Sequence, residues 1–223
     1  MSNKIFSSIF TAILSAFFFS LAATTAPYFY GVGGGVFLLL SVRYVSTFIF
    51  ASILNKSPKK IKSKATHIRL ILISIFQAIF IASYMYSISL IPLSLAVVVI
   101  YTFPIITFFV NSILKSRSID FLSAAALLVS LFGIWILVQG DSSDWNLWGV
   151  FWGLIASLAQ VTVNILSRHK SVESGWGLIQ YIMVLPSVVF VLIYFIVTLE
   201  PIASVSSEML LWSILSAMGM TGG

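Results

Sequence analysis

The chain has 223 residues, of which 60% are apolar and only 8% are charged, and its mean hydropathy is +1.10. Soluble proteins carry about 25% charged residues, so this composition excludes a cytosolic enzyme and a nucleic-acid-binding domain. The lack of cysteine also excludes a secreted module held together by disulfides. We therefore expect an all-α polytopic membrane protein that binds no nucleic acid, despite its net charge of +6.

Eight apolar runs predict helices that cross the lipid bilayer, because about 20 residues span ~30 Å of hydrocarbon. The last run opens at Met209 and holds 15 residues before the printed sequence stops, so we expect a truncated chain whose continuation adds further spans. Lys4 and residues 21–26 also resemble a signal peptide, but the first run exceeds the apolar core of such peptides and favours a transmembrane helix. The seven full spans are predicted at residues 5–26, 32–54, 70–91, 93–114, 121–138, 147–166 and 178–199.

The basic residues predict the orientation of these spans, since Lys and Arg favour short cytoplasmic loops. With the N-terminus inside, the cytoplasmic segments hold 11 of the 12 basic residues and the opposite segments hold none. Four of the six acidic residues lie in the opposite segments. We therefore expect a multi-pass protein of the cell (inner) membrane, with its N-terminus and residues 55–69 cytoplasmic and residues 139–146 outside.

The remaining basic residue, Arg43, lies near the middle of the second predicted span. At ~1.5 Å per residue, Arg43 is ~17 Å from either membrane interface, which is too far for its extended side chain to reach the water outside. It must therefore face protein or a water-filled cavity. A central charge costs ~2.5 to 3.5 kcal/mol and requires compensation. No Asp or Glu lies inside a predicted span. The alternatives are a backbone carbonyl at a broken helix, a group beyond Gly223 or a bound anion, and we expect Arg43 near Pro104 and the third span.

Two mid-span prolines predict bent helices. Pro104 leaves the carbonyl of Ile100 without its usual donor, and Pro186 does the same to Ile182. Each bend is either a structural kink or part of the substrate path. Small residues at four-residue spacing predict closely packed helices in two spans, at Ala12, Ala16 and Ser20 and at Gly149, Gly153 and Ser157.

The order of the spans predicts an internal repeat. Five spans precede the acidic segment 139–146, and a second unit begins after it. Because five is odd, the two units insert in opposite orientations, which is typical of inverted-repeat transporters that bind substrate at the midplane.

Five stretches together are typical of one family: SVRY at 41–44, ASYMYSISLIPLSL at 82–95, VVIYTFPIITFF at 98–109, LVSLFGIWILVQ at 128–139 and WGVFWGLIASLAQVTVNILSRHK at 148–170. They resemble the EamA-like permeases of the drug/metabolite transporter superfamily. After the fourth span that family commonly has a Gly-Glu pair, and Lys115 and Ser116 stand there instead, so the resemblance implies no role for that glutamate.

The resemblance implies a ten-helix inverted-repeat transporter fold, of which seven full helices and part of an eighth are present. It implies a first EamA-like five-helix repeat at residues 1–140 and a second at 147–223, truncated in its third helix. The implied function is a secondary transporter, or permease, that moves a small metabolite or drug across the plasma membrane by alternating access, which we expect to be an exporter. Expected partners are the lipid bilayer and a small-molecule substrate, without cofactor or metal, and a homodimer is left open.

The candidates for the substrate path are polar, aromatic or helix-breaking residues inside the predicted spans. For each, hydrogen bonding between helices or anchoring at the lipid interface is the alternative role. For Arg43 the alternatives are a structural role, favoured because members with different substrates share this signature, and direct anion contact. The candidates are Arg43, Gln77, Tyr84, Tyr101, Pro104, Gln160, Asn164 and Gln180.

Two other function classes are alternatives to a transporter. A membrane-embedded enzyme needs a nucleophile with a base, a metal cluster or a phosphate cradle. The chain has no cysteine, and its two histidines, His67 and His169, fall in predicted cytoplasmic loops, so we expect no enzyme. A truncated or non-transporting membrane scaffold stays open as the alternative to a transporter.

Overall fold

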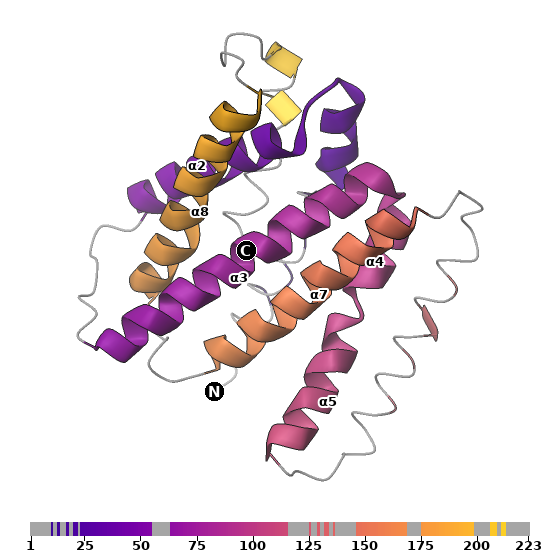
Figure 1. The fold of residues 1–223 in the computed structure, drawn as a ribbon, viewed down its shortest axis with the longest axis vertical. Coiled ribbons are helices and arrows are strands. Elements are labelled where there is room, and N and C mark those ends of the chain that lie inside the picture. The colour runs from indigo at the N-terminus through magenta and orange to yellow at the C-terminus, as the bar shows by residue number, and fades with distance from the viewer. Residues whose placement is uncertain are drawn as a thin grey trace. The chain divides into compact units, whose positions relative to one another are not determined.

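The computed structural model describes mainly helical segments of the chain (Figure 1). Every element in the described part is an α-helix, as the composition predicted. Residues 23–31 are helical, and the labelled helices are α2 (Val36–Leu54), α3 (Lys64–Leu90), α4 (Leu93–Ile100), α5 (Phe103–Lys115), α7 (Leu147–Ser167) and α8 (Gly175–Thr198). The described residues are 10, 13, 17, 20–21, 23–54, 63–115, 125, 129, 132–133, 136, 146–168, 175–198, 206–208 and 211–212.

Three stretches within the described residues are long and apolar enough to cross a membrane: Lys64–Leu90, Leu93–Val110 and Leu147–Ser167. Val36–Ile49 and Val184–Val197 are shorter apolar helices. These five stretches coincide with five of the predicted spans. The predicted spans at 5–26 and 121–138 and the one opening at Met209 fall largely outside the described residues.

The turn between the first two predicted spans differs from the expectation. Residues 27–31 were expected to form a loop, but they are helical, and the helix ends at a glycine turn instead. The N–H of Gly34 donates to the carbonyl of Phe29 at 3.0 Å, and that of Gly33 donates to Tyr30 at 3.0 Å. This is a Schellman cap, and its left-handed position is Gly33, at φ 86°. Since the cap ends at Gly34, α2 begins at Val36, four residues later than predicted.

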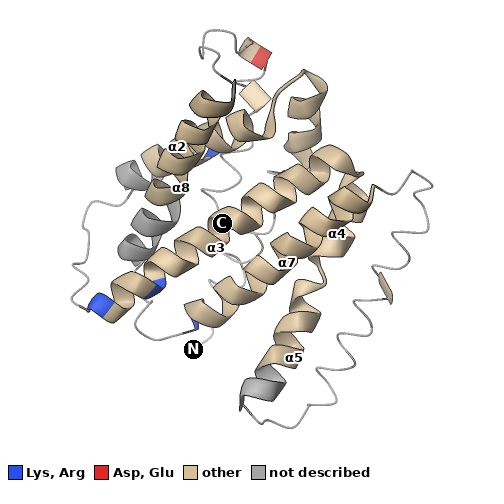
Figure 2. Cartoon of the chain, viewed as in Figure 1, with Lys and Arg blue, Asp and Glu red and all other residues tan. Residues whose placement is uncertain are grey.

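Helix α3 begins six residues before its predicted apolar run, at Lys64. Hydropathy locates the part of a helix that lies in hydrocarbon, whereas a helix can continue into water as long as its residues have good helix propensity. Figure 2 shows the positive charges of α3 confined to its first turns, at Lys64 and Arg69. The predicted third span is therefore the apolar part of a longer helix.

The chain divides into two compact units, residues 1–74 with 173–223 and residues 75–172. In the first unit, Tyr44 of α2 stacks on Phe190 of α8, with ring centroids 5.5 Å apart. Leu38 of α2 and Tyr194 of α8 line one pocket, so these two helices run in opposite directions. This agrees with the alternation predicted for the second and seventh spans. The repeat boundaries at 1–140 and 147–223 stay a prediction.

In the second unit, α4 and α5 run in the same direction as α7. Near the N-terminus of α7, Gly149 lies against Ile91, and further along the helix Ser157 lies against Thr102. The C-terminal part of α3 runs the other way, since Leu90 lies near Gly149 and Ser87 lies near Gly153. The alternation of predicted spans requires the fourth and sixth to be parallel and the third to oppose them. The packing of this unit agrees with it.

Candidate functional site

The fourth predicted span is two helices rather than one bent helix. Helix α4 ends at Ile100 and α5 begins at Phe103, with Tyr101 and Thr102 between them. The N–H of Thr102 donates to the carbonyl of Val99 at 3.2 Å, a tightened last turn. Pro104 has no N–H to continue the ladder. The predicted bend is therefore a complete break between two helices, and broken helices inside a membrane are where many transporters bind substrate.

Helix α7 lies against this broken helix through its small residues. A Cβ atom added at Gly149 would lie 2.5 Å from Cγ2 of Ile91, and one added at Gly153 would lie 2.8 Å from Cγ1 of Val99. The hydroxyl of Ser87 in α3 donates to the carbonyl of Gly149 at 2.8 Å. The close packing predicted for this span is confirmed, and it joins α3, α4 and α7 in one unit.

The helix break is joined to α7 by a hydrogen bond between two side chains. Oγ1 of Thr102 lies 2.8 Å from Oγ of Ser157, and Ser157 is fully buried. The Thr102 hydroxyl also lies 2.8 Å from the carbonyl of Val99, to which it donates. Because the Thr102 hydroxyl proton is used in that bond, the Thr102 oxygen accepts a hydrogen bond from the hydroxyl of Ser157. The polar groups of the break are thus held against α7.

One turn further along α7 lies a pair of carboxamides. Nε2 of Gln160 donates to Oδ1 of Asn164 at 3.2 Å. Oε1 of Gln160 is buried and has no hydrogen-bond partner among the described residues. Because the two ends of a carboxamide are assigned from their contacts, one end of Gln160 lacks a partner whichever way it is turned. Together, Thr102, Ser157, Gln160 and Asn164 form a polar row, and we call it the α7 polar row.

Arg43 lies in the first unit and is only 1% exposed, so it faces the protein interior as predicted. Its position along the helix is nearer one end than predicted. Because α2 begins at Val36, Arg43 is seven residues, or ~10 Å, from the start of the helix. Pro104 belongs to the other unit, so the predicted proximity of Arg43 to Pro104 stays a prediction.

Comparison with known families identifies the chain. The family model of the EamA-like transporter family matches residues 6–139, which include Arg43 and the break at Pro104. The chain belongs to this family. It is thus a helical membrane protein of a transporter family. No curated protein and no solved structure matches it.

The other candidates of this EamA-like protein are spread over both units. Gln77 is half-buried in α3, and Tyr84 is buried and stacked on Phe80 at 6.2 Å. Tyr101 lies in the helix break and is 49% exposed. Gln180 lies in α8, where its side chain is outside the described residues. Of the candidates, the structure therefore brings Gln160 and Asn164 together.

Three contact residues of the EamA-like fold were not among the candidates. Thr102 and Ser157 form the hydrogen bond at the break, and Ser87 bonds to α7. A hydroxyl beside a mid-span proline was a usable signal for Thr102, since such groups bond the backbone that proline frees. Ser157 belongs to the small-residue stripe, and nothing in the sequence distinguishes Ser87 from the other serines of α3.

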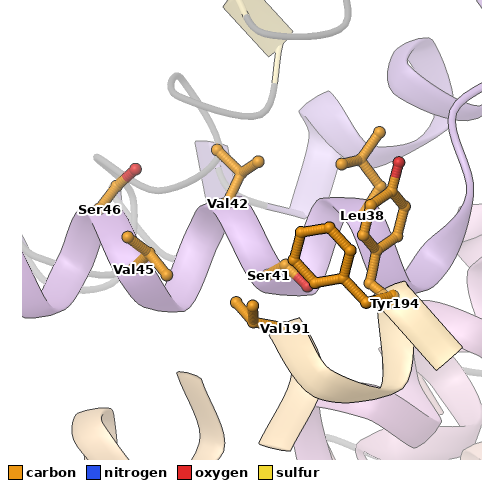
Figure 3. A pocket seen from close by; sticks show the side chains of 8 residues that line it. Leu38, Ser41, Val42, Val45, Ser46, Val191 and Tyr194 are labelled. Atoms are coloured by element: carbon orange, nitrogen blue, oxygen red, sulfur yellow. The ribbon is translucent and has the colours of Figure 1, made fainter. Parts of the chain in front are cut away.

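A cavity of about 200 Å³ lies between α2 and α8 of the EamA-like protein (Figure 3). It is smaller than ligand pockets of ~300 to 1,000 Å³ and nearly all apolar. Its hydroxyl at Ser41 already donates to the carbonyl of Phe37 at 2.7 Å. Among the described residues there is also no cluster of His, Cys, Asp and Glu that could hold a metal. The lining residues are Leu38, Ser41, Val42, Val45, Ser46, Val191, Tyr194 and Phe195.

Proposed function

We propose that the chain is a secondary transporter that moves a small metabolite or drug across the cell (inner) membrane by alternating access, in the outward direction and with its N-terminus in the cytoplasm. The observation that carries the proposal is the helix broken at Tyr101 and Thr102, whose polar groups lie against the α7 polar row. In hydrocarbon, irregular backbone is tolerated only where protein or water satisfies it. Direction and location rest on the family and on the basic loops.

The α7 polar row suits recognition of an uncharged polar part of a substrate. Hydroxyls donate and accept hydrogen bonds, and a carboxamide offers two donors and one acceptor oxygen. Gln160 has one buried end that no described residue satisfies. A buried polar group left in this way costs about 1 to 3 kcal/mol, which a substrate hydroxyl or amide would remove.

The break also supports the alternating-access part of the proposal. Helix α4 packs on α7 at Gly153, where a Cβ atom would meet Val99, and Ile91, just before α4, packs on Gly149. Helix α5 begins beyond the break and has no continuous hydrogen-bond ladder to α4. A helix divided in this way can change the angle of one half while the other half keeps its packing. Rocking of α5 about Thr102 would open and close a path beside the α7 polar row.

Counterflow in proteoliposomes tests the function. The purified chain is reconstituted, and liposomes loaded in turn with amino acids, nucleosides, amines or sugars are assayed for accumulation of the same labelled compound. We expect accumulation of at least one class above protein-free liposomes. Ser157→Ala should reduce it severalfold because it removes the bond to the break, while Ser167→Ala, at the exposed end of the same helix, should not. Folded protein that moves none of these classes would contradict the proposal.

A further inference from the structure

We propose that Tyr86 of α3, with Trp148, Phe151 and Trp152 of α7, forms a surface that binds phospholipid at the boundary between headgroups and acyl chains. We call these four residues the aromatic patch. They lie where α3 ends and α7 begins, on two helices that run in opposite directions. The inference concerns contact with lipid and does not depend on the proposed function.

The rings of the aromatic patch contact one another edge to face. The ring centroid of Trp152 lies 5.3 Å from that of Tyr86 and 6.0 Å from that of Phe151, and both pairs of planes are 73° apart. The ring of Trp148 lies 5.8 Å from that of Phe151, at 89°. Rings in direct contact leave no room for a ligand between them. The aromatic patch is therefore a surface and not a cage for a cation.

The aromatic patch is exposed on its outer side. Trp148 is 68% exposed, Phe151 is 49% exposed and Tyr86 is 39% exposed. Several neighbouring apolar side chains that are exposed together mark a contact with a partner or with a membrane. Helix α7 is long and apolar enough to cross a bilayer, and it begins at Leu147. The aromatic patch thus lies at one end of a segment that can cross the membrane.

The exposed side of each helix becomes aliphatic away from the aromatic patch. On α7 the next exposed side chains are Leu154 and Leu158, and on α3 the nearest exposed side chains before Tyr86 are Ile79 and Ile75. Trp and Tyr favour the headgroup boundary because they combine a large apolar ring with a polar group, whereas aliphatic side chains favour hydrocarbon. The change from aromatic to aliphatic therefore marks the level at which the hydrocarbon begins.

The basic residues mark the opposite boundary at the expected distance. Arg168, the C-cap of α7, follows Trp148 by 20 residues, or ~30 Å, and no charged residue lies between them. On α3, Lys64 and Arg69 precede Tyr86 by 22 and 17 residues, or ~33 and ~26 Å. The hydrocarbon of a bilayer is ~30 Å thick. Both helices therefore separate their aromatic and basic ends by about one hydrocarbon thickness.

The faces of α7 favour lipid over a second copy of the chain. In a bilayer, helices associate through small residues that let their backbones approach closely. The small residues of α7 are Gly149, Gly153 and Ser157, and all three lie against α3 or the broken helix of the same unit. The exposed side chains that begin at the aromatic patch are Trp, Phe and Leu, which keep another backbone at a distance. Flexible acyl chains can fit such a face.

Fluorescence quenching by nitroxide-labelled lipids tests the inference. The full chain is reconstituted in phosphatidylcholine vesicles that carry the nitroxide either at the headgroup or near the end of the acyl chain. The fluorescence lost in Trp148→Phe gives the contribution of Trp148. The fluorescence gained in Leu158→Trp, at an exposed position ~15 Å further along α7, is the matched control. We expect the headgroup nitroxide to quench the Trp148 contribution at least about twofold more than the chain-end nitroxide, and the reverse for Leu158→Trp.

Two quenching results would overturn the inference. If neither nitroxide quenches the Trp148 contribution, protein covers the aromatic patch, as in contact with a second copy. If the chain-end nitroxide quenches it more, the aromatic patch lies within the hydrocarbon.

A second measurement keeps the test independent of the tryptophan variants, because these can change folding. Spin labels are attached to Leu147→Cys and Leu158→Cys of the cysteine-free chain, and both positions are exposed. We expect a water-soluble nickel chelate to reach the label at position 147 more readily, and oxygen to reach the label at position 158 more readily. The same ratio of the two accessibilities at both positions would also overturn the inference.

Discussion

The substitution Gly→Ala should change the free energy of unfolding in opposite directions at different glycines, because α7 contacts its neighbours closely at only some of them. In a helix, Gly→Ala adds about 1 kcal/mol of stability through propensity alone. At Gly133, where no atom of the described residues lies within 4 Å of the added Cβ, we expect only this gain. We therefore expect Gly133→Ala to raise the free energy of unfolding by roughly 0.5 to 1 kcal/mol.

At Gly149 and Gly153 the added methyl has no room. The new Cβ of Gly149→Ala would lie 3.2 Å from Cβ of Leu90, and that of Gly153→Ala would lie 3.2 Å from Cβ of Val99. A Cβ atom cannot rotate away, so the helices must separate, which also lengthens the 2.8 Å bond from Ser87 to Gly149. Overpacking costs about 1 to 3 kcal/mol, which outweighs the propensity gain.

We thus expect both of these variants to be destabilised by about 1 to 2 kcal/mol, with Gly149→Ala the more affected because its nearest contact is 2.5 Å against 2.8 Å. The assay is reversible unfolding in mixed detergent micelles by titration with sodium dodecyl sulfate, followed by circular dichroism. Stability of Gly149→Ala or Gly153→Ala equal to or above that of Gly133→Ala would refute the close approach of these helices and the reasoning built on it.

Three further predictions test other parts of the fold. Gly33→Ala should lower the free energy of unfolding by about 1 to 2 kcal/mol, measured in the same detergent titration, because Gly33 has φ 86° and an L-residue is strained there. Thr102→Val and Ser157→Ala should be coupled by about 0.6 kcal/mol in a double-mutant cycle, since both remove one 2.8 Å bond, and additive effects would argue against that bond. In the cysteine-free chain, a cysteine at Ser142 should react with an impermeant maleimide in intact cells and one at Ser63 only after permeabilisation, and the reverse pattern would overturn the topology.

The interruption at Pro104 and the burial of Arg43 could be predicted because each follows from a local cost. A proline removes an N–H wherever it stands, and a guanidinium inside an apolar run must avoid lipid. The position of Arg43 along its helix differs from the prediction because it depends on where α2 begins. That position is decided by the Schellman cap at Gly33, and hydropathy does not register a cap.

The partners of these residues could not be predicted. Thr102 meets Ser157 across 55 positions of sequence, and Ser87 meets Gly149 across 62. Tyr44 lies on Phe190, which belongs to a span predicted without any link to the second. Each contact requires two helices to present particular faces to each other, and the sequence of one helix does not state which face that is.

Hydropathy and charge are sufficient to predict a helical membrane protein, the five apolar stretches that the structure describes, and the residues that cannot face lipid. Which residues meet depends on how the helices pack. In a soluble protein, the apolar stripe of a helix marks its packing face, because the opposite side must be wet. In a bilayer, both the lipid-facing and the protein-facing sides of a helix are apolar, so hydropathy identifies the helix but not its packing face. That face is determined by the fit of small residues and by a few hydrogen bonds between helices.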